Sequence, residues 1–112
     1  MTNQNSKSVA LNEVQTLAAQ LKALAIQALG AIRERDEVLL QHVLLVRAPL
    51  LERVKELALV VPELVAHCPE MISAADAEME VAAAARARYN ELFEKWQQVR
   101  QIAAIRKAYN FQ

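Results

Sequence analysis

Apolar side chains recur at intervals of three and four residues along the first third of the chain. They are Leu11, Val14, Leu17, Ala18, Leu21, Leu24, Ala25, Ala28, Leu29 and Ile32. This spacing places them on one face of an α-helix for about six turns. Ser8 or Asn12 is suited to cap the free amides at its start, and the charged run 33–36 interrupts the apolar face. We therefore predict a helix that begins between Ser8 and Asn12 and ends after Ile32, preceded by a flexible segment 1–8.

A second helical pattern follows at once. Asp36 is suited to cap it, and Glu37 is favoured in its first turn by the helix dipole. Its apolar face comprises Leu39, Leu40, Val43, Leu44, Leu50, Leu51, Val54 and Leu57. Pro49 removes one amide donor, so the helix either kinks near Val46 or restarts with Pro49 at its first position. We favour a kinked but continuous helix.

The remaining chain is divided by two prolines. Pro62 and Pro69 bracket a short apolar stretch, which we interpret as a turn of helix lying on the core. No further breaker follows Pro69, which predicts a single final helix of about 30 to 35 residues. Its broad apolar face comprises Met71, Ile72, Ala75, Met79, Ala82, Tyr89, Leu92, Phe93, Trp96, Val99, Ile102 and Ala103.

The predicted fold is all-α. Short connections make successive helices antiparallel neighbours, so we expect one domain over residues 1–112: an antiparallel three-helix bundle with a short extra helical turn. The long C-terminal helix should project beyond the others. The single glycine and the lack of hairpin dipeptides argue against strands.

Charge is balanced overall but unevenly distributed. Thirteen basic residues match thirteen acidic ones, so no global field would recruit nucleic acid or an anionic membrane. Segments 1–35, 36–80 and 81–112 nevertheless carry +2, −6 and +4. Helices whose opposite charges face one another or point to solvent explain this split most simply, and an interaction patch is the alternative.

Few residues offer catalytic or metal-binding chemistry. One glycine cannot build a phosphate-binding loop. His67, Cys68 and His42 lack the spacing of a metal site, and we expect a partly buried His67 and Cys68 beside a proline turn. We therefore predict no enzyme activity, no cofactor and no metal.

The compartment is also suggested by the sequence. A lone cysteine fits a reducing cytosol. The polar N-terminus does not have the pattern of a signal peptide, and the apolar runs are too short for membrane insertion. A cytoplasmic location is expected.

Three of the five aromatic residues lie on one helical face. Tyr89, Phe93 and Trp96 follow at i, i+4 and i+7. They either pack in the core or anchor a partner, because a small bundle with a protruding helix cannot cover that face by itself. The predicted partner-binding residues are Tyr89, Leu92, Phe93, Trp96, Val99, Ile102 and Tyr109.

The order of elements resembles the FliT-type flagellar export chaperones over roughly Val14 to Asn110. The similarity lies in Leu29-Gly30-Ala31-Ile32-Arg33, in Leu39-Leu40-Gln41, in Asp76 to Arg88 followed by Asn90-Glu91-Leu92, and in Ala108-Tyr109-Asn110. It implies a cytoplasmic chaperone that holds the secreted filament-cap subunit before export and meets the export ATPase. In some members it also implies contact with a transcriptional activator complex.

Two hypotheses lead on the residues alone, and a third, an enzyme or metalloprotein using His67 and Cys68, would be tested by metal analysis of the purified protein. In the first, an apolar helix of a secreted client lies on the aromatic face and is kept from assembling too early. In the second, the chain is a structural helical-bundle or coiled-coil homo-oligomer, for example a homodimer, or a general adaptor with no role in secretion.

Overall fold

The protein consists of four helices joined by very short connections. A computed structural model describes residues 2–110, with side chains described from residue 6 to residue 109. The helices are α1 (Thr2–Glu34), α2 (Glu37–Val60), α3 (Pro62–Ala66) and α4 (Pro69–Asn110). No strand occurs among the described residues, which confirms the all-helical prediction.

The connection between α1 and α2 contains only Arg35 and Asp36. Arg35 has a φ of 59°, the left-handed conformation that commonly ends a helix. Its amide donates to the Ile32 carbonyl at 3.2 Å, and the Asp36 amide donates to the Ala31 carbonyl at 2.8 Å. Asp36 also caps α2, as predicted, since its Oδ1 accepts from the Leu39 amide at 3.0 Å. One helix therefore ends and the next begins within two residues.

Pro49 does not interrupt α2. The helix continues from Glu37 to Val60 with the proline inside it, which confirms the predicted continuous element. It ends where the Val61 amide donates to the Leu57 carbonyl at 2.7 Å. Pro62 then opens α3 at the position where its missing amide is tolerated. The predicted short helical turn between the prolines is present as α3.

Two predicted helix lengths were wrong. The first helix begins at Thr2 rather than between Ser8 and Asn12, and it ends at Glu34. The last helix has 42 residues rather than about 30 to 35. Apolar periodicity marks only the turns that could pack, whereas polar residues can extend a helix beyond them. Arg, Glu, Gln and Lys favour this extension at the end of α4, but the first residues of α1 are mostly Thr, Asn and Ser, which do not. Met1 lies outside the described residues, and the flexibility of segment 1–8 stays a prediction.

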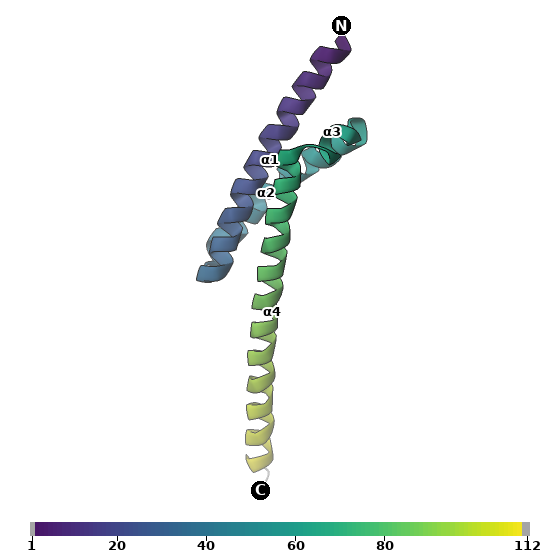
Figure 1. Ribbon diagram of the computed structural model, residues 1–112. Coiled ribbons are helices and arrows are strands. Elements are labelled where there is room, and N and C mark those ends of the chain that lie inside the picture. The colour runs from purple at the N-terminus through teal and green to yellow at the C-terminus, as the bar shows by residue number, and fades with distance from the viewer. Residues whose placement is uncertain (1, 111–112) are drawn as a thin grey trace.

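Helix α1 lies against both α2 and α4. Figure 1 shows α2 returning along α1 in the opposite direction, and α4 running the same way as α1. The Cα atoms of α2 and α4 stay more than 8 Å apart throughout the described chain. Consequently α1 supplies most of the buried surface.

The core lies along the inner face of α1. Its buried side chains are Val14, Leu17, Ala18, Leu21, Ala25, Ala28, Ala31 and Ile32, together with Val43 and Leu57 of α2, Cys68, and Ala74 of α4. The side chains of this inner face are large near the middle of α1 and are mostly alanine toward its C-terminal end. Small side chains there allow the neighbouring helices to approach closely.

The molecule is strongly elongated. Its radius of gyration is 21.2 Å and its extents are 86 × 24 × 20 Å, whereas a compact domain of this length has a radius of about 13 Å. Figure 1 shows the cause: the C-terminal half of α4 continues alone past the turn that joins α1 to α2. The predicted projecting C-terminal helix is therefore present.

Candidate protein-binding surface

The first half of α4 uses one face to pack on the rest of the protein. The residues of this half that are buried or half-buried recur at helical spacing: Met71, Ser73, Ala74, Ala77, Glu78, Val81, Ala84, Arg88 and Glu91. The sequence placed Ile72 and Met79 on the packing face, but both side chains are exposed. The packing face of α4 is thus narrower and richer in alanine than expected.

The same face continues into the second half of α4. Eighteen residues make five turns of an α-helix, so Leu92, Trp96 and Val99 lie directly in line with Ala74, Glu78 and Val81 of the packing face. Ala103, in line with the exposed Ala85, lies beside this line. We call Leu92, Trp96, Val99 and Ala103 the open stripe. Every described side chain from Leu92 to Tyr109 is exposed. The open stripe is uncovered because α1, which covers the equivalent positions above it, ends at Glu34.

All seven predicted partner-binding residues lie on exposed turns of α4. Their exposed fractions range from 45% to 74%, for Tyr89, Leu92, Phe93, Trp96, Val99, Ile102 and Tyr109. Core packing of Tyr89, Phe93 and Trp96, one of the two alternatives, is therefore wrong within this single chain. The physical reason is the length of α4, which carries these rings away from the core. Their role in partner binding stays a prediction.

The exposed aromatic rings contact their helical neighbours. The Tyr89 and Phe93 rings stack, with centroids 6.3 Å apart and planes 14° apart. The Arg100 guanidinium lies 5.2 Å from the centre of the Trp96 ring, at a cation–π distance. These contacts order the rings on the helix without removing them from water.

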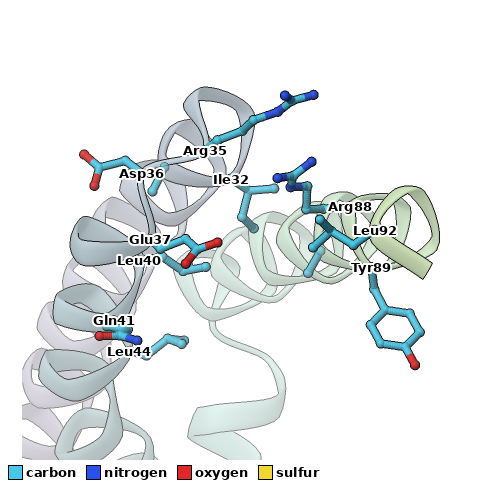
Figure 2. Close-up of a pocket in the computed structure, with 12 residues that line it drawn as sticks. Ile32, Arg35, Asp36, Glu37, Leu40, Gln41, Leu44, Arg88, Tyr89 and Leu92 are labelled. Atoms are coloured by element: carbon cyan, nitrogen blue, oxygen red, sulfur yellow. The ribbon is translucent and has the colours of Figure 1, made fainter. Parts of the chain in front are cut away.

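A cleft of about 320 Å³ lies where α4 leaves the other helices. Its lining is mainly apolar and comes from three helices: Ala31, Ile32, Leu40, Leu44, Ala85 and Leu92, with Arg35, Asp36, Glu37, Gln41, Arg88 and Tyr89 completing it. Figure 2 shows Ile32, Leu40 and Leu92 pointing toward its interior, while the Tyr89 ring points away. The sequence prediction missed this cleft except for Leu92 and Tyr89, because it requires the ends of separate helices to meet.

Glu91 joins the two sides of the cleft. Its Oε1 lies 2.9 Å from Arg35 Nη2 and 3.3 Å from Lys95 Nζ, and its Oε2 lies 3.2 Å from Arg88 Nη1. Hydrogen bonds from Lys95 and Arg88, with the nearby charge of Arg35, hold the pKa of Glu91 below its ordinary value. The carboxylate therefore fixes the α1–α2 connection to α4 at the point where the open stripe begins.

Opposite charges also join the helices elsewhere. Arg53 of α2 binds both carboxylate oxygens of Glu13 in α1, and Arg47 of α2 binds Glu78 of α4. The Arg53 hydrogen bond holds the pKa of Glu13 below its ordinary value. Arg47 and Glu78 both belong to the acidic segment 36–80, and Arg53 is a basic residue of that segment paired with an acidic residue of segment 1–35. The interpretation of the uneven charge distribution therefore stays a prediction.

The residues considered for catalysis or metal binding, Cys68, His67 and His42, lie away from the open stripe. Cys68 is buried, as expected, and its thiol lies 3.1 Å from Glu70 Oε2, to which it donates. That hydrogen bond is the main reason why the pKa of Glu70 is lowered. His67 is exposed rather than partly buried, as is His42. Within residues 2–110, no three His, Cys, Asp or Glu side chains are grouped closely enough to hold a metal ion.

Comparison with known proteins found no matching family model, no similar curated protein and no similar solved structure. In the part of the chain that the structure describes, no helix combines the length and the hydropathy needed to cross a bilayer.

Proposed function

We propose that the protein is a cytoplasmic export chaperone of the flagellar type III system. It holds an apolar helical segment of a secreted subunit, the filament-cap protein, along the open stripe and thereby prevents premature assembly. The supporting observation is that the packing face of α4 continues past the end of α1 with nothing on it. Binding needs no covalent step and no cofactor.

The proposal is supported by the unfavourable free energy of leaving the apolar face of such a helix in water. Isolated helices are marginally stable, and most helical stability in proteins comes from packing an apolar face. Residues 92–109 have that face, and every one of their side chains is exposed. Fully burying each large apolar side chain contributes about 1.5 to 3 kcal/mol. A partner helix would supply that burial, and the cleft would receive its first turn.

The flagellar setting rests on the resemblance described above. It supplies the identity of the client, the meeting with the export ATPase and the cytoplasmic location. The finer description of the fold as an antiparallel three-helix bundle, with α3 as the extra turn and α4 as the projecting helix, is part of this proposal. The antiparallel direction of α2 along α1 supports it, whereas the Cα atoms of α2 and α4 stay more than 8 Å apart.

Capture of a filament-cap protein by the purified chain tests this function. Trp96→Ala should weaken the complex by about tenfold or more, because large central side chains dominate helix-in-groove binding. Phe93→Ala, beside the open stripe, should weaken it less. Met79→Ala is the matched control, since Met79 is also exposed on α4 but lies away from the packing face. Circular dichroism confirms that each variant stays helical. Unchanged affinity for both aromatic variants would contradict the proposed surface.

The alternative is a structural homo-oligomer. It is favoured by one observation: positions 92, 96, 99 and 103 have the spacing of a coiled-coil face. Sedimentation across a dilution series separates the two functions. An oligomer that persists at nanomolar concentration and captures no client would support the structural role.

A further inference from the structure

The charged residues beside the open stripe indicate the charge of the partner that it binds. Lys95 precedes Ile102 by seven residues, and Arg106 lies four residues beyond Ile102, so both flank one edge of the stripe. Arg100 and Lys107 follow Phe93 at intervals of seven and flank the other edge. All four side chains are exposed. Basic residues therefore border both edges of the stripe.

Acidic residues are missing from these edges. Glu94 is two positions from both Leu92 and Trp96, which places it on the opposite side of the helix. Glu91 lies at the upper end of the stripe and is already bound by Arg35, Arg88 and Lys95. Residues 95–112 contain no Asp or Glu. The border of the stripe is thus positive along its whole length.

We propose that the open stripe binds an amphipathic helix whose apolar face is bordered by Asp and Glu. The inference rests on the proposed helix-binding function and specifies the chemistry of its partner. Residues 92–109 span about 27 Å, so the partner helix has about five turns. Its carboxylates pair with Arg100, Arg106 and Lys107, and with Lys95, which also holds Glu91, while its apolar face covers Leu92, Trp96 and Val99.

The position of α1 favours a helix over a flat surface. The stripe continues the face on which α1 packs, so α1 and the Arg35-Asp36 connection stand on the same side of α4. A partner helix about 10 Å wide fits end to end with α1. A bilayer surface that approached the stripe would meet the end of α1 first.

The same charges disfavour a second copy as the occupant. Two open stripes facing each other would bring Lys95, Arg100, Arg106 and Lys107 of both chains along one interface. Like charges that face each other across such an interface destabilise it. An acidic partner relieves this repulsion, whereas self-pairing doubles it.

The test uses two synthetic 18-residue amphipathic peptides that contain no tryptophan. Both carry the same Leu and Ala face, bordered by Glu in one peptide and by Lys in the other. Trp96 is the only tryptophan of the chain, so its fluorescence reports burial of the stripe directly. We expect a blue shift with the Glu peptide and affinity about tenfold higher than for the Lys peptide at low salt. The difference should shrink in about 0.5 M salt.

Charge reversal supplies the second arm. The double variant K95E/R100E should lose the preference for the Glu peptide and bind the Lys peptide more tightly. The control K22E/R86E changes the net charge equally at exposed positions away from the stripe, and it should keep the preference. Circular dichroism of both double variants checks that the helices remain folded.

Each contrary outcome overturns the inference in a recognisable way. Equal binding of both peptides rejects the acidic partner but leaves helix binding intact. Failure of both peptides to bind rejects the acidic partner and the proposed function together. A Trp96 shift with anionic phospholipid vesicles and none with the Glu peptide assigns the stripe to a membrane. A concentration-dependent shift without any peptide assigns it to a second copy.

Discussion

Arg47 of α2 binds Glu78 of α4 through two parallel contacts. Nε donates to Oε1 at 2.9 Å and Nη2 donates to Oε2 at 2.6 Å, and both side chains are partly buried. The pair spans helices whose Cα atoms stay more than 8 Å apart. The pair therefore connects α2 directly to α4, two helices that otherwise both pack on α1.

A double-mutant cycle should show that this pair is coupled. Arg47→Ala and Glu78→Ala, alone and together, should give a coupling energy of about 1 to 2 kcal/mol, because paired, charge-assisted hydrogen bonds exceed ordinary surface pairs. Urea unfolding followed by circular dichroism measures it. The control is the exposed pair Lys55–Glu52 at 3.2 Å, for which we expect about 0.5 kcal/mol or less. Equal coupling for both pairs would refute the assignment.

Two leucines near the end of α2 should respond very differently to truncation. Leu57 is 6% exposed and packs with Val14, Leu17 and Cys68, whereas Leu59 is 86% exposed. Leu57→Ala should lower the free energy of unfolding by about 2 to 4 kcal/mol through lost burial and a residual cavity. Leu59→Ala should change it by about 0.5 kcal/mol or less. Thermal melts distinguish the two, and similar losses would place the core elsewhere.

Arg35 occupies a conformation that glycine adopts more readily. A side chain at a φ of 59° costs about 1 kcal/mol relative to glycine. Arg35→Gly should therefore be about 1 kcal/mol more stable than Arg35→Ala, since both variants lose the contact with Glu91 and only glycine removes the strain. Denaturant unfolding of the two variants gives the comparison. A less stable glycine variant would mean that the left-handed turn is not retained.

Stability should fall in acid below about pH 4.5. The pKa of each of Glu13, Glu70 and Glu91 is lowered in the folded chain from an ordinary value of 4.5. Such groups stabilise the fold above their unfolded pKa, and that contribution is lost as the pH falls through the folded pKa. Melting temperatures between pH 6 and pH 3 should show the decline, with a shallower slope for Glu91→Gln. Parallel curves for the variant and the parent chain would argue against the Glu91 contacts.

Local chemistry made part of this fold predictable. The Asp36 cap, the continuous α2 and the short helix between two prolines follow from capping and from the position of proline. The ends of α1 and α4 did not follow, because a helix can extend past its packed turns. Periodicity also placed Met79 and Trp96 on one broad face, since it does not show which neighbour covers each turn.

The candidate surface was predictable in composition but not in extent. Tyr89, Phe93 and Trp96 were identified from their spacing, yet their exposure depends on where α1 stops beside α4. The cleft depends on the same relationship, because Leu92 is far in the sequence from Ile32 and Leu40. Its position could be known only once the two-residue turn was placed against Glu91.

Because the turn at Arg35 and Asp36 is tight, the length of the α1–α2 hairpin determines how much of α4 is covered. Each heptad inserted into both helices would carry the turn about 10.5 Å farther along α4. Two such insertions would bring α1 over Leu92, Trp96 and Val99, and the protein would satisfy its own apolar face. The shortness of the hairpin is thus what leaves α4 available to another molecule.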